Sequence, residues 1–132
     1  MNEASSTTSM FSEAELAYLT EGRKLGRLAT VDPTGAPHVV PTGWSYNAEL
    51  DTIDVGGRDL ATTRKFRNVG SHPRVCLVID DVLPPWQPRC VQVRGEAEAL
   101  PHATAPDGED LGALIRIHPT KVVSWGLDTA KA

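Results

Sequence analysis

Three basic residues stand close together where a short helix is predicted to begin. Residues 62–74 read TTRKFRNVGSHPR, which places Arg64, Lys65 and Arg67 in the first two helical turns. A helix N-terminus already carries a partial charge of about +0.5 and exposes free N–H groups, so cations are unfavourable there. A bound anion removes the conflict, because it accepts hydrogen bonds from the N–H groups and pairs with the side chains. The pattern therefore indicates a phosphate-binding site.

The overall charge favours a small anionic ligand over a polymer. The chain has 132 residues and a net charge of −4, and its pI of about 5.5 argues against nucleic-acid binding. Its basic residues nevertheless gather in two stretches, 23–27 and 58–67, which indicates a locally basic groove on an acidic protein. The alternative interpretation of the second stretch is a solvated basic helix face.

Other familiar chemical motifs are missing from the sequence. No P-loop, no Gly-x-Ser-x-Gly and no zinc-type histidine spacing occurs, so we predict no metal and assign no catalytic residue. The first ten residues are polar and lack a signal-peptide core, and no apolar run is long enough to span a membrane. We therefore expect a cytoplasmic protein in which Cys76 and Cys90 are reduced, buried thiols, with a disulfide as the alternative if their strands are neighbours.

Two helices are predicted. Ser12 and Glu15 have the spacing of a capping box, so a helix begins after Ser12. The basic helix covers about residues 62–69. Either Thr62 or Asp59 would cap it, and Thr62 is better placed to leave the N-terminal donors open to phosphate.

The remaining elements are strands, predicted over residues 25–31, 37–46, 52–55, 74–80, 89–100, 114–118 and 121–125, the last two as a pair or one bent strand. Residues 74–80 are nearly all apolar and so should be buried on both faces, whereas 89–100 alternates like a half-exposed antiparallel strand. The prolines of 83–88 exclude a strand interior, and 101–109 reads as a polar loop. We predict a mainly β protein, a small Greek-key barrel of about six antiparallel strands with short helices. It forms one domain over residues 11–132 behind a flexible leader of residues 1–10.

The order of these motifs resembles the pyridoxamine 5′-phosphate oxidase-like split barrels. The likeness comprises residues 62–65 (Thr-Thr-Arg-Lys), 72–75 (His-Pro-Arg-Val), 89–97 and Trp125, and it extends over about residues 12–127. It implies a six-stranded split barrel of the FMN-binding type, in which the Arg–Lys pair grips the cofactor phosphate.

A narrower resemblance is to an actinobacterial branch of probable enzymes that depend on coenzyme F420, a deazaflavin. It rests on residues 56–59, 63–69, 80–86, 117–119 and 124–126. It implies hydride transfer between reduced F420 and a small organic substrate. Such a cofactor carries the redox chemistry itself, so the absence of a visible catalytic pair is no obstacle.

The resemblance implies a set of cofactor contacts and one candidate for the substrate pocket. The implied cofactor-binding residues are Val39, Val40, Pro41, Thr42, Gly56, Gly57, Arg58, Thr63, Arg64, Lys65 and Trp125. Arg58 and Arg67 are the residues that could meet the phosphodiester and acidic tail of F420. Trp86, in the proline-rich loop, is a candidate for the substrate pocket, with packing over a barrel end as the alternative. For Trp125 the alternative is a core or dimer-interface role.

Departures from the parent family affect both cofactor and substrate. A flavin-binding lysine of the family falls near Gly43 and a flavin-contacting glutamine falls at Cys90, which weakens the case for FMN. The Arg-Leu-His segment that follows the family's tryptophan is replaced by Gly-Leu-Asp at 126–128, so pyridoxine phosphate chemistry is not expected.

The resemblance also implies a homodimer with two cofactor sites at the interface, where Trp125 reaches the partner's cofactor. We expect a small-molecule substrate and neither a nucleic-acid nor a membrane partner. Two alternatives stay open: an FMN-dependent oxidoreductase of the same fold, and a non-catalytic flavin- or deazaflavin-binding protein. The substrate itself depends on loops around 81–89 and 101–110, which the sequence does not interpret.

Overall fold

A computed structural model describes residues 8–127 of the chain. The elements along it are α1 (Glu13–Thr20), β1 (Gly26–Val31), β2 (Pro37–Thr42), β3 (Ser45–Asn47), β4 (Thr52–Val55), the 3-10 helix η2 (Leu60–Thr62), α2 (Arg64–Ser71), β5 (Arg74–Leu83), β6 (Gln87–Thr104) and β7 (Asp110–Trp125). The predicted leader, residues 1–10, falls mostly outside the described residues. Within it, the hydroxyl of Ser9 donates a hydrogen bond to Asp51 at 2.7 Å.

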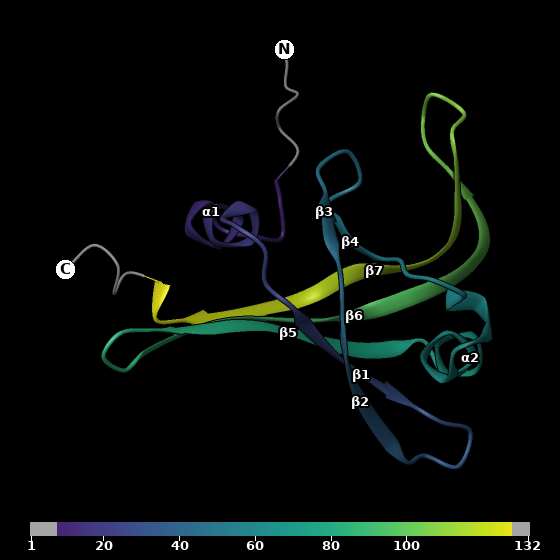
Figure 1. Cartoon of the computed structure of the whole chain (residues 1–132), viewed down its shortest axis with the longest axis horizontal. Helices are drawn as coiled ribbons and strands as arrows, with labels where there is room; N and C mark the ends of the chain where they lie inside the picture. The colour runs from purple at the N-terminus through teal and green to yellow at the C-terminus, as the bar shows by residue number, and fades with distance from the viewer. Residues whose placement is uncertain (1–7, 128–132) are drawn as a thin grey trace.

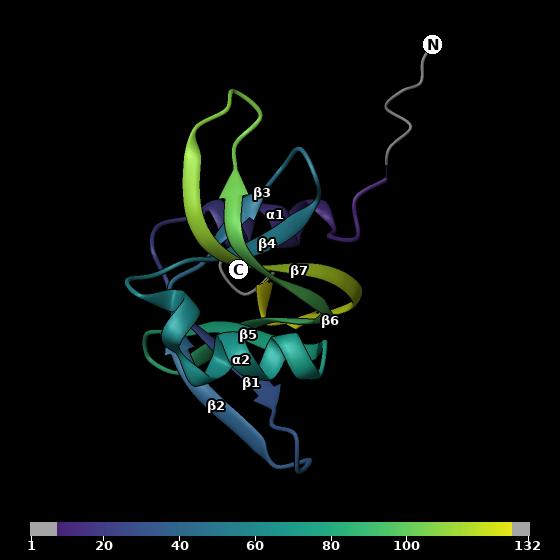
Figure 2. The ribbon, with the colours of Figure 1, turned by 90° about the vertical axis from the view of Figure 1, so that its right-hand side faces the viewer.

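The strands form one antiparallel sheet that curls into a split barrel (Figures 1 and 2). Their order is β2-β1-β5-β6-β7-β4-β3, so the two edge strands are consecutive in the chain and only Gly43 and Trp44 separate them. This short link draws the two edges of the sheet toward each other. The predicted β-barrel class is therefore confirmed. The sheet has seven strands, not six, because the predicted strand 37–46 divides at Gly43–Trp44.

β5 differs from the prediction that it is buried on both faces. Val75, Leu77 and Ile79 are buried against the core, whereas Cys76 and Val78 on the opposite face are half-buried. The apolar run therefore spans one core face and one partly exposed face. The two cysteines are free thiols, as predicted, although only Cys90 is fully buried. Their strands, β5 and β6, are neighbours, but the two cysteines do not face each other. Cys76 of β5 lies opposite Arg94, and Cys90 of β6 lies opposite Asp80.

β6 and β7 form the longest hairpin and extend beyond their predicted limits. The predicted loop 101–109 begins only after Thr104, and β7 continues through Pro119 without a break. The register between β6 and β7 shifts by one residue between Arg94 and Gly95, and this irregularity accommodates Pro119 within the strand. Prolines were also expected to exclude strand structure over 83–88, but β5 reaches Leu83 and β6 starts at Gln87. Only the turn between them is irregular.

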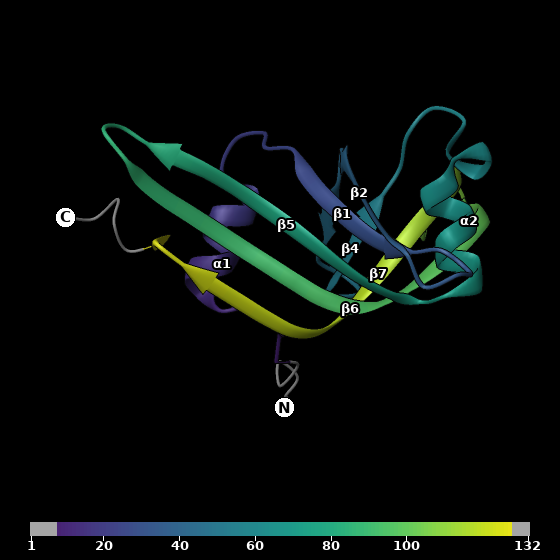
Figure 3. The same ribbon diagram turned by 90° about the horizontal axis from the view of Figure 1, so that it is seen from below.

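The core lies on the concave face of the sheet. Its fully buried side chains come from most of the strands and include Leu28, Ile53, Val55, Leu77, Ile79, Val91, Val93, Ile115 and Ile117. Figure 3 shows α2 near one end of the long strands and α1 nearer the other. α1 begins with the predicted capping box, in which Ser12 and Glu15 each accept a hydrogen bond from the other's N–H group. Within the described part of the chain, every helix is too short or too polar to cross a lipid bilayer.

Candidate functional site

The N-terminus of α2 is capped by one side chain and leaves its first donors open. Thr63 is the N-cap: its backbone is extended, and its Oγ1 accepts a hydrogen bond from the N–H of Phe66 at 3.3 Å. The prediction that Thr62 is the cap is wrong. Thr62 ends η2, and its hydroxyl donates to the carbonyl of Asp59 at 2.8 Å. The helix spans residues 64–71 instead of the predicted 62–69. As at any helix N-terminus, the first N–H groups, those of Arg64 and Lys65, have no hydrogen-bond partner within the helix.

The cations beside this N-terminus have no acidic partner in the part of the chain that the structure describes. Among residues 8–127, Arg58, Arg64 and Lys65 form no ion pair and no side-chain hydrogen bond within the chain. We call these three residues the basic cluster. Arg67 donates from Nη1 to the carbonyl of Thr62 at 2.7 Å, and the first turn of α2 contains no acidic residue. Unpaired positive charge beside open helix donors fits a phosphate group.

The glycine segment that precedes η2 ends at Arg58, six residues before the first residue of α2. Gly57 has φ +152° and Asp59 has φ +51°, so the backbone turns sharply between β4 and η2. A Cβ placed on Gly57 would meet no atom within 4 Å, so the space beside this backbone is open. Asp59, η2 and Thr63 then lead from Arg58 to the start of α2.

The predicted ring-binding residues occupy β2, an edge strand that pairs only with β1. Val39 is 63% exposed, and Val40 and Pro41 are also exposed, whereas Thr42 is buried. An exposed apolar strand with an unpaired backbone edge offers both a flat surface and hydrogen-bonding groups. These features suit a heteroaromatic ring system with a polar edge.

A buried hydrogen bond fixes α2 beside the β1–β2 hairpin. Asn68 Nδ2 donates to Thr30 Oγ1 at 3.0 Å, and both residues are buried. Thr30 pairs in register with His38 on β2, so this bond sets the helix relative to the edge strand. Figure 2 shows α2 lying against this part of the sheet. The fold thus places the basic cluster and β2 at the same end of the folded molecule.

Two other predicted residues lie at the opposite end. Trp125 ends β7 opposite Cys90 of β6, whereas α2 leads into Arg74, which lies opposite Glu96 of β6 (Figure 1). The step from Cys90 to Glu96 covers roughly 20 Å of strand. Within one chain, Trp125 therefore does not meet the basic cluster.

Trp86 occupies the turn between β5 and β6 at this far end, next to the cis peptide bond Pro84–Pro85. Its side chain is 75% exposed and Trp125 is 51% exposed. Neither of these side chains is packed into the core of the chain that carries it.

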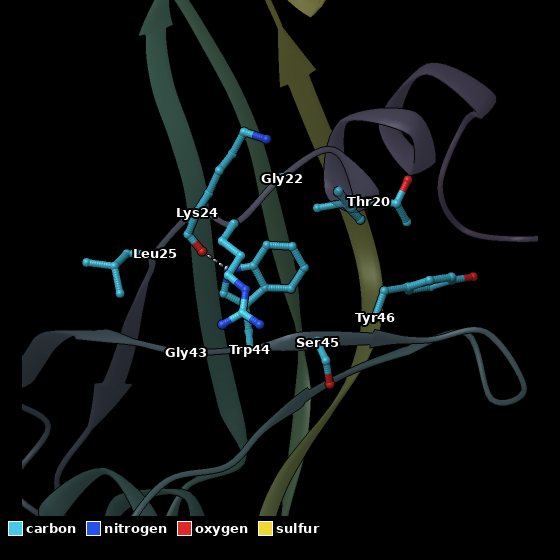
Figure 4. A pocket seen from close by; sticks show the side chains of 10 residues that line it. Thr20, Gly22, Lys24, Leu25, Gly43, Trp44, Ser45 and Tyr46 are labelled. Carbon is cyan, nitrogen blue, oxygen red and sulfur yellow. Dashed lines mark hydrogen bonds between the residues drawn. The ribbon is translucent and has the colours of Figure 1, made fainter.

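The structure also forms a cavity that sequence reasoning missed. A space of about 570 Å³ lies between the segment that links α1 to β1 and the segment that links β2 to β3 (Figure 4). Trp44 Nε1, in the β2–β3 link, donates a hydrogen bond to the carbonyl of Lys24, in the α1–β1 link, at 2.8 Å. This bond connects the two segments that line the cavity. Arg23 and Lys24 already stood out as a basic pair. Nothing in the sequence places that pair beside an aromatic residue twenty positions further on.

A buried arginine is the second group that was missed. Arg89, only 5% exposed, donates from Nη2 to Asp81 at 2.6 Å and to Glu21 at 3.0 Å. The hydroxyl of Tyr18 donates to the same Asp81 carboxylate at 2.7 Å. The hydrogen bond from Arg89 lowers the pKa of Asp81, and burial raises the pKa of Tyr18. The sequence did hold a signal for this burial: Arg89 stands two residues before Val91, so both side chains lie on the buried face of the strand.

Among the residues that the structure describes, the remaining titratable groups do not form a reactive centre. Burial raises the pKa of Cys90 to about 11 and also raises that of Cys76, so neither is a thiolate nucleophile at neutral pH. His38, on β2, is hydrogen-bonded to Asp32, with 2.9 Å between Nε2 and Oδ2. Within residues 8–127, no three His, Cys, Asp or Glu side chains are grouped as a metal site requires. The geometry therefore fits binding of an anionic cofactor that brings its own chemistry.

Comparison with known proteins places this arrangement among enzymes. A family model described as pyridoxamine 5′-phosphate oxidase matches residues 12–125. A curated relative from Streptomyces rimosus subsp. rimosus, named 5a,11a-dehydrotetracycline/5a,11a-dehydrooxytetracycline reductase, is 42% identical over 123 residues. The match covers 89% of this chain and 84% of that relative.

Solved structures share the fold at lower identity. A conserved hypothetical protein of Mycobacterium tuberculosis, Rv2991, has a TM-score of 0.69 at 21% identity, covering 92% of this chain and 89% of its own. A protein described as an F420 reductase has a TM-score of 0.59 at 24% identity, covering 80% and 94%. A FAD-binding protein from Mycobacterium smegmatis has a TM-score of 0.65 at 21% identity, covering 89% and 97%. These likenesses show a common fold among proteins named for different cofactors.

Proposed function

Because the chain belongs to the pyridoxamine 5′-phosphate oxidase family and is an oxidoreductase, we propose that it transfers a hydride from reduced coenzyme F420 to a small organic substrate. The observation that carries this proposal is the unpaired basic cluster at the N-terminus of α2. F420 has a phosphodiester and an acidic glutamyl tail, so it needs more positive charge than the single phosphate of FMN.

The proposed division of labour follows the positions of the residues. Arg64, Lys65 and the open N–H groups of α2 hold the phosphate, with Thr63 and the Gly56–Gly57 turn shaping the backbone around it. Arg58 and Arg67 face the acidic tail. Val39, Val40, Pro41 and Thr42 lie under the ring system and exclude water from one of its faces.

When bound, reduced F420 supplies the hydride, which carries two electrons, and a proton from water completes reduction of the substrate. The chain therefore needs to bind, orient and shield the reactants, and we assign no side chain as acid or base. The name of the Streptomyces relative supports a conjugated ring compound as the substrate, because that enzyme is named for reducing dehydrotetracyclines.

We further propose a homodimer in which each cofactor site uses both chains. The basic cluster and Trp125 lie at opposite ends of the folded protomer. A two-fold axis can place the basic cluster of each protomer next to Trp125 of its partner. Trp125 would then border the partner's cofactor, and Trp86 would face the substrate there. Their exposure supports this arrangement, since large exposed aromatic side chains are typical of interfaces.

FMN bound to the same barrel is the alternative cofactor, and a non-catalytic flavin- or deazaflavin-binding protein is the alternative function. Parallel fluorescence titrations of the purified protein with F420 and FMN distinguish the cofactors. We expect tighter binding of F420, and preference for FMN would contradict the proposal. Binding of F420 without reduction of any acceptor in a screen of conjugated ring compounds would favour the non-catalytic alternative.

The double variant Arg64→Ala with Lys65→Ala tests the phosphate site. We expect F420 binding to weaken by about 3–6 kcal/mol, since each charge-assisted hydrogen bond contributes roughly 1.5–3 kcal/mol. Arg74→Ala is the matched control, because this exposed arginine also lacks an acidic partner in the described chain but lies on β5. Unchanged affinity in the double variant would remove the basis of the proposal.

A further inference from the structure

We propose that the 570 Å³ cavity between the α1–β1 and β2–β3 links is the substrate pocket of this reductase, and that it accepts a flat fused-ring compound that is anionic at neutral pH. This inference rests on the proposed function, because it takes β2 as the strand that carries the reducing ring. To the conjugated ring compound already proposed, it adds a pocket and a negative charge on the substrate.

The position of the cavity is the first argument. Gly43, which lines it, directly follows Thr42, the last residue of β2. A ring that lies along Val39–Thr42 therefore has one end beside a residue that lines the cavity. Hydride transfer needs the donor and acceptor atoms in near contact, and this cavity adjoins the proposed ring strand.

Two fixed aromatic side chains form its walls. Trp44 is held by its hydrogen bond to the carbonyl of Lys24, and the hydroxyl of Tyr46 donates to Asp51 at 2.6 Å. The ring of Phe11 packs edge-on against Tyr46, with centroids 5.6 Å apart. Figure 4 shows Trp44 in the middle of the labelled lining residues, with Tyr46 and Thr20 to one side. Rigid aromatic walls and a volume within the usual range for ligand sites suit a planar fused ring.

The charge around the cavity indicates an acidic ligand. Two cations and no carboxylate residue line it. Lys24 is already engaged, because its Nζ donates to the carbonyls of Tyr18 and Glu21 at 3.3 and 2.5 Å. Arg23 is exposed and has no ion pair or hydrogen bond within the described residues. A planar guanidinium free to pair with an enolate, phenolate or carboxylate oxygen would select such substrates over neutral ones.

A matched pair of naphthoquinones tests this class directly. Lawsone, an acidic 2-hydroxy-1,4-naphthoquinone, and menadione, its neutral 2-methyl counterpart, have the same ring size, and quenching of tryptophan fluorescence measures their binding to the F420-loaded protein. We expect Arg23→Gln to weaken lawsone binding by about ten- to fiftyfold and menadione binding by less than twofold. Arg74→Gln, which removes a distant unpaired cation, should change neither.

A second variant tests the cavity without removing charge. A Cβ at Gly43 would meet no atom within 4 Å, and its φ is not positive, so Gly43→Val should fold while it narrows the pocket. We expect weaker binding of both quinones, by tenfold or more, with F420 affinity within threefold of wild type.

The outcomes separate this inference from the proposed function. Unchanged quinone binding in both variants, with F420 still bound, would overturn the pocket assignment and leave the reductase proposal standing. Equal loss of F420 and lawsone binding in Gly43→Val, with no effect of Arg23→Gln, would assign the cavity to the cofactor and also overturn it. Failure of the wild-type protein to bind F420 would instead contradict the proposed function.

Discussion

At the scale of single residues, the arginines of this protein divide by whether they have acidic partners. Arg27, Arg89 and Arg116 each pair with an aspartate, and the last two are largely buried. These cations hold strands and helices together. The basic cluster and Arg23 have no such partner among residues 8–127, and they are the cations to which we assign ligands. An acidic partner thus marks a cation as structural. An unpaired cation needs a second feature, such as an open helix N-terminus or a cavity, before we assign it a ligand, because Arg74 is unpaired as well.

Arg89 is the residue whose loss should most affect stability. Arg89→Met leaves Asp81 and Glu21 without their partner, although both carboxylates retain some contact with water. We expect the free energy of unfolding to fall by about 3 kcal/mol, the lower end for breaking a buried ion pair, because solvent screens the remaining charges. Urea denaturation at pH 7 measures the change. A loss below 0.5 kcal/mol would show that the pair contributes little.

The same variant should change how stability depends on pH. The hydrogen bond from Arg89 keeps the pKa of Asp81 in the folded chain below its unfolded value of about 3.9. Asp81 therefore stabilises the fold above about pH 4, and this contribution is lost as the pH falls through its folded pKa. Between pH 5 and pH 2, the urea midpoint should fall less steeply in Arg89→Met than in wild type. Parallel curves would contradict this assignment.

At the scale of elements, the bulge beside Gly95, where Thr120 of β7 is left out of the pairing, decides whether β6 and β7 can pair along their full length. A Cβ at this position would lie 2.3 Å from the carbonyl oxygen of His118, a backbone atom that cannot rotate away. We expect Gly95→Ala to lower the free energy of unfolding by about 2–3 kcal/mol, since the strands must separate locally. Thermal or urea unfolding measures it.

Gly70→Ala is the matched control for that substitution. Gly70 lies within α2, and an added Cβ there would meet no atom within 4 Å. Because alanine favours the helical conformation over glycine, and because Gly70 lies in the last turn, this variant should gain at most about 0.5–1 kcal/mol. Equal effects of the two substitutions would mean that the close approach at Gly95 is relieved without cost.

At the scale of the whole molecule, the proposed sites require two chains, and mixing variants tests this. Arg64→Ala with Lys65→Ala disables one end of the chain and Trp125→Ala the other. A mixed dimer restores one intact site when each site draws on both chains. After unfolding and refolding an equal mixture, we expect about a quarter of the wild-type F420 sites, since about half of the dimers are mixed and each has one good site. Sedimentation measures the dimer, and F420 titration counts the sites.

Two outcomes of the mixing experiment would contradict the shared-site proposal. No recovery, with dimers present, would mean that Trp125 and the basic cluster do not serve the same site. Strong F420 binding by the Trp125→Ala protein alone would show that the tryptophan is not needed to bind the cofactor.

Local patterns in the sequence determined the elements that depend on nearby residues. The capping box at Ser12 and Glu15 started α1 where predicted, and alternation along 89–100 identified the buried face of β6. The cationic start of α2 was also visible, although the cap moved by one residue to Thr63 because η2 takes up Thr62. These features follow from backbone geometry over a few residues, so sequence alone specifies them.

Tertiary structure decided what lies beside what. Only the curl of the sheet places Arg23 near Trp44, puts Arg89 between Asp81 and Glu21, and separates Trp125 from the basic cluster by the length of the strands. It also left one face of β5 partly exposed, where the apolar run alone predicted burial on both. Local periodicity and capping identified most of the strands and the charged helix, and the number and order of these elements predicted the barrel class. The cavity and the two-ended arrangement of the sites were decided by contacts between residues far apart in the chain, which no local pattern encodes.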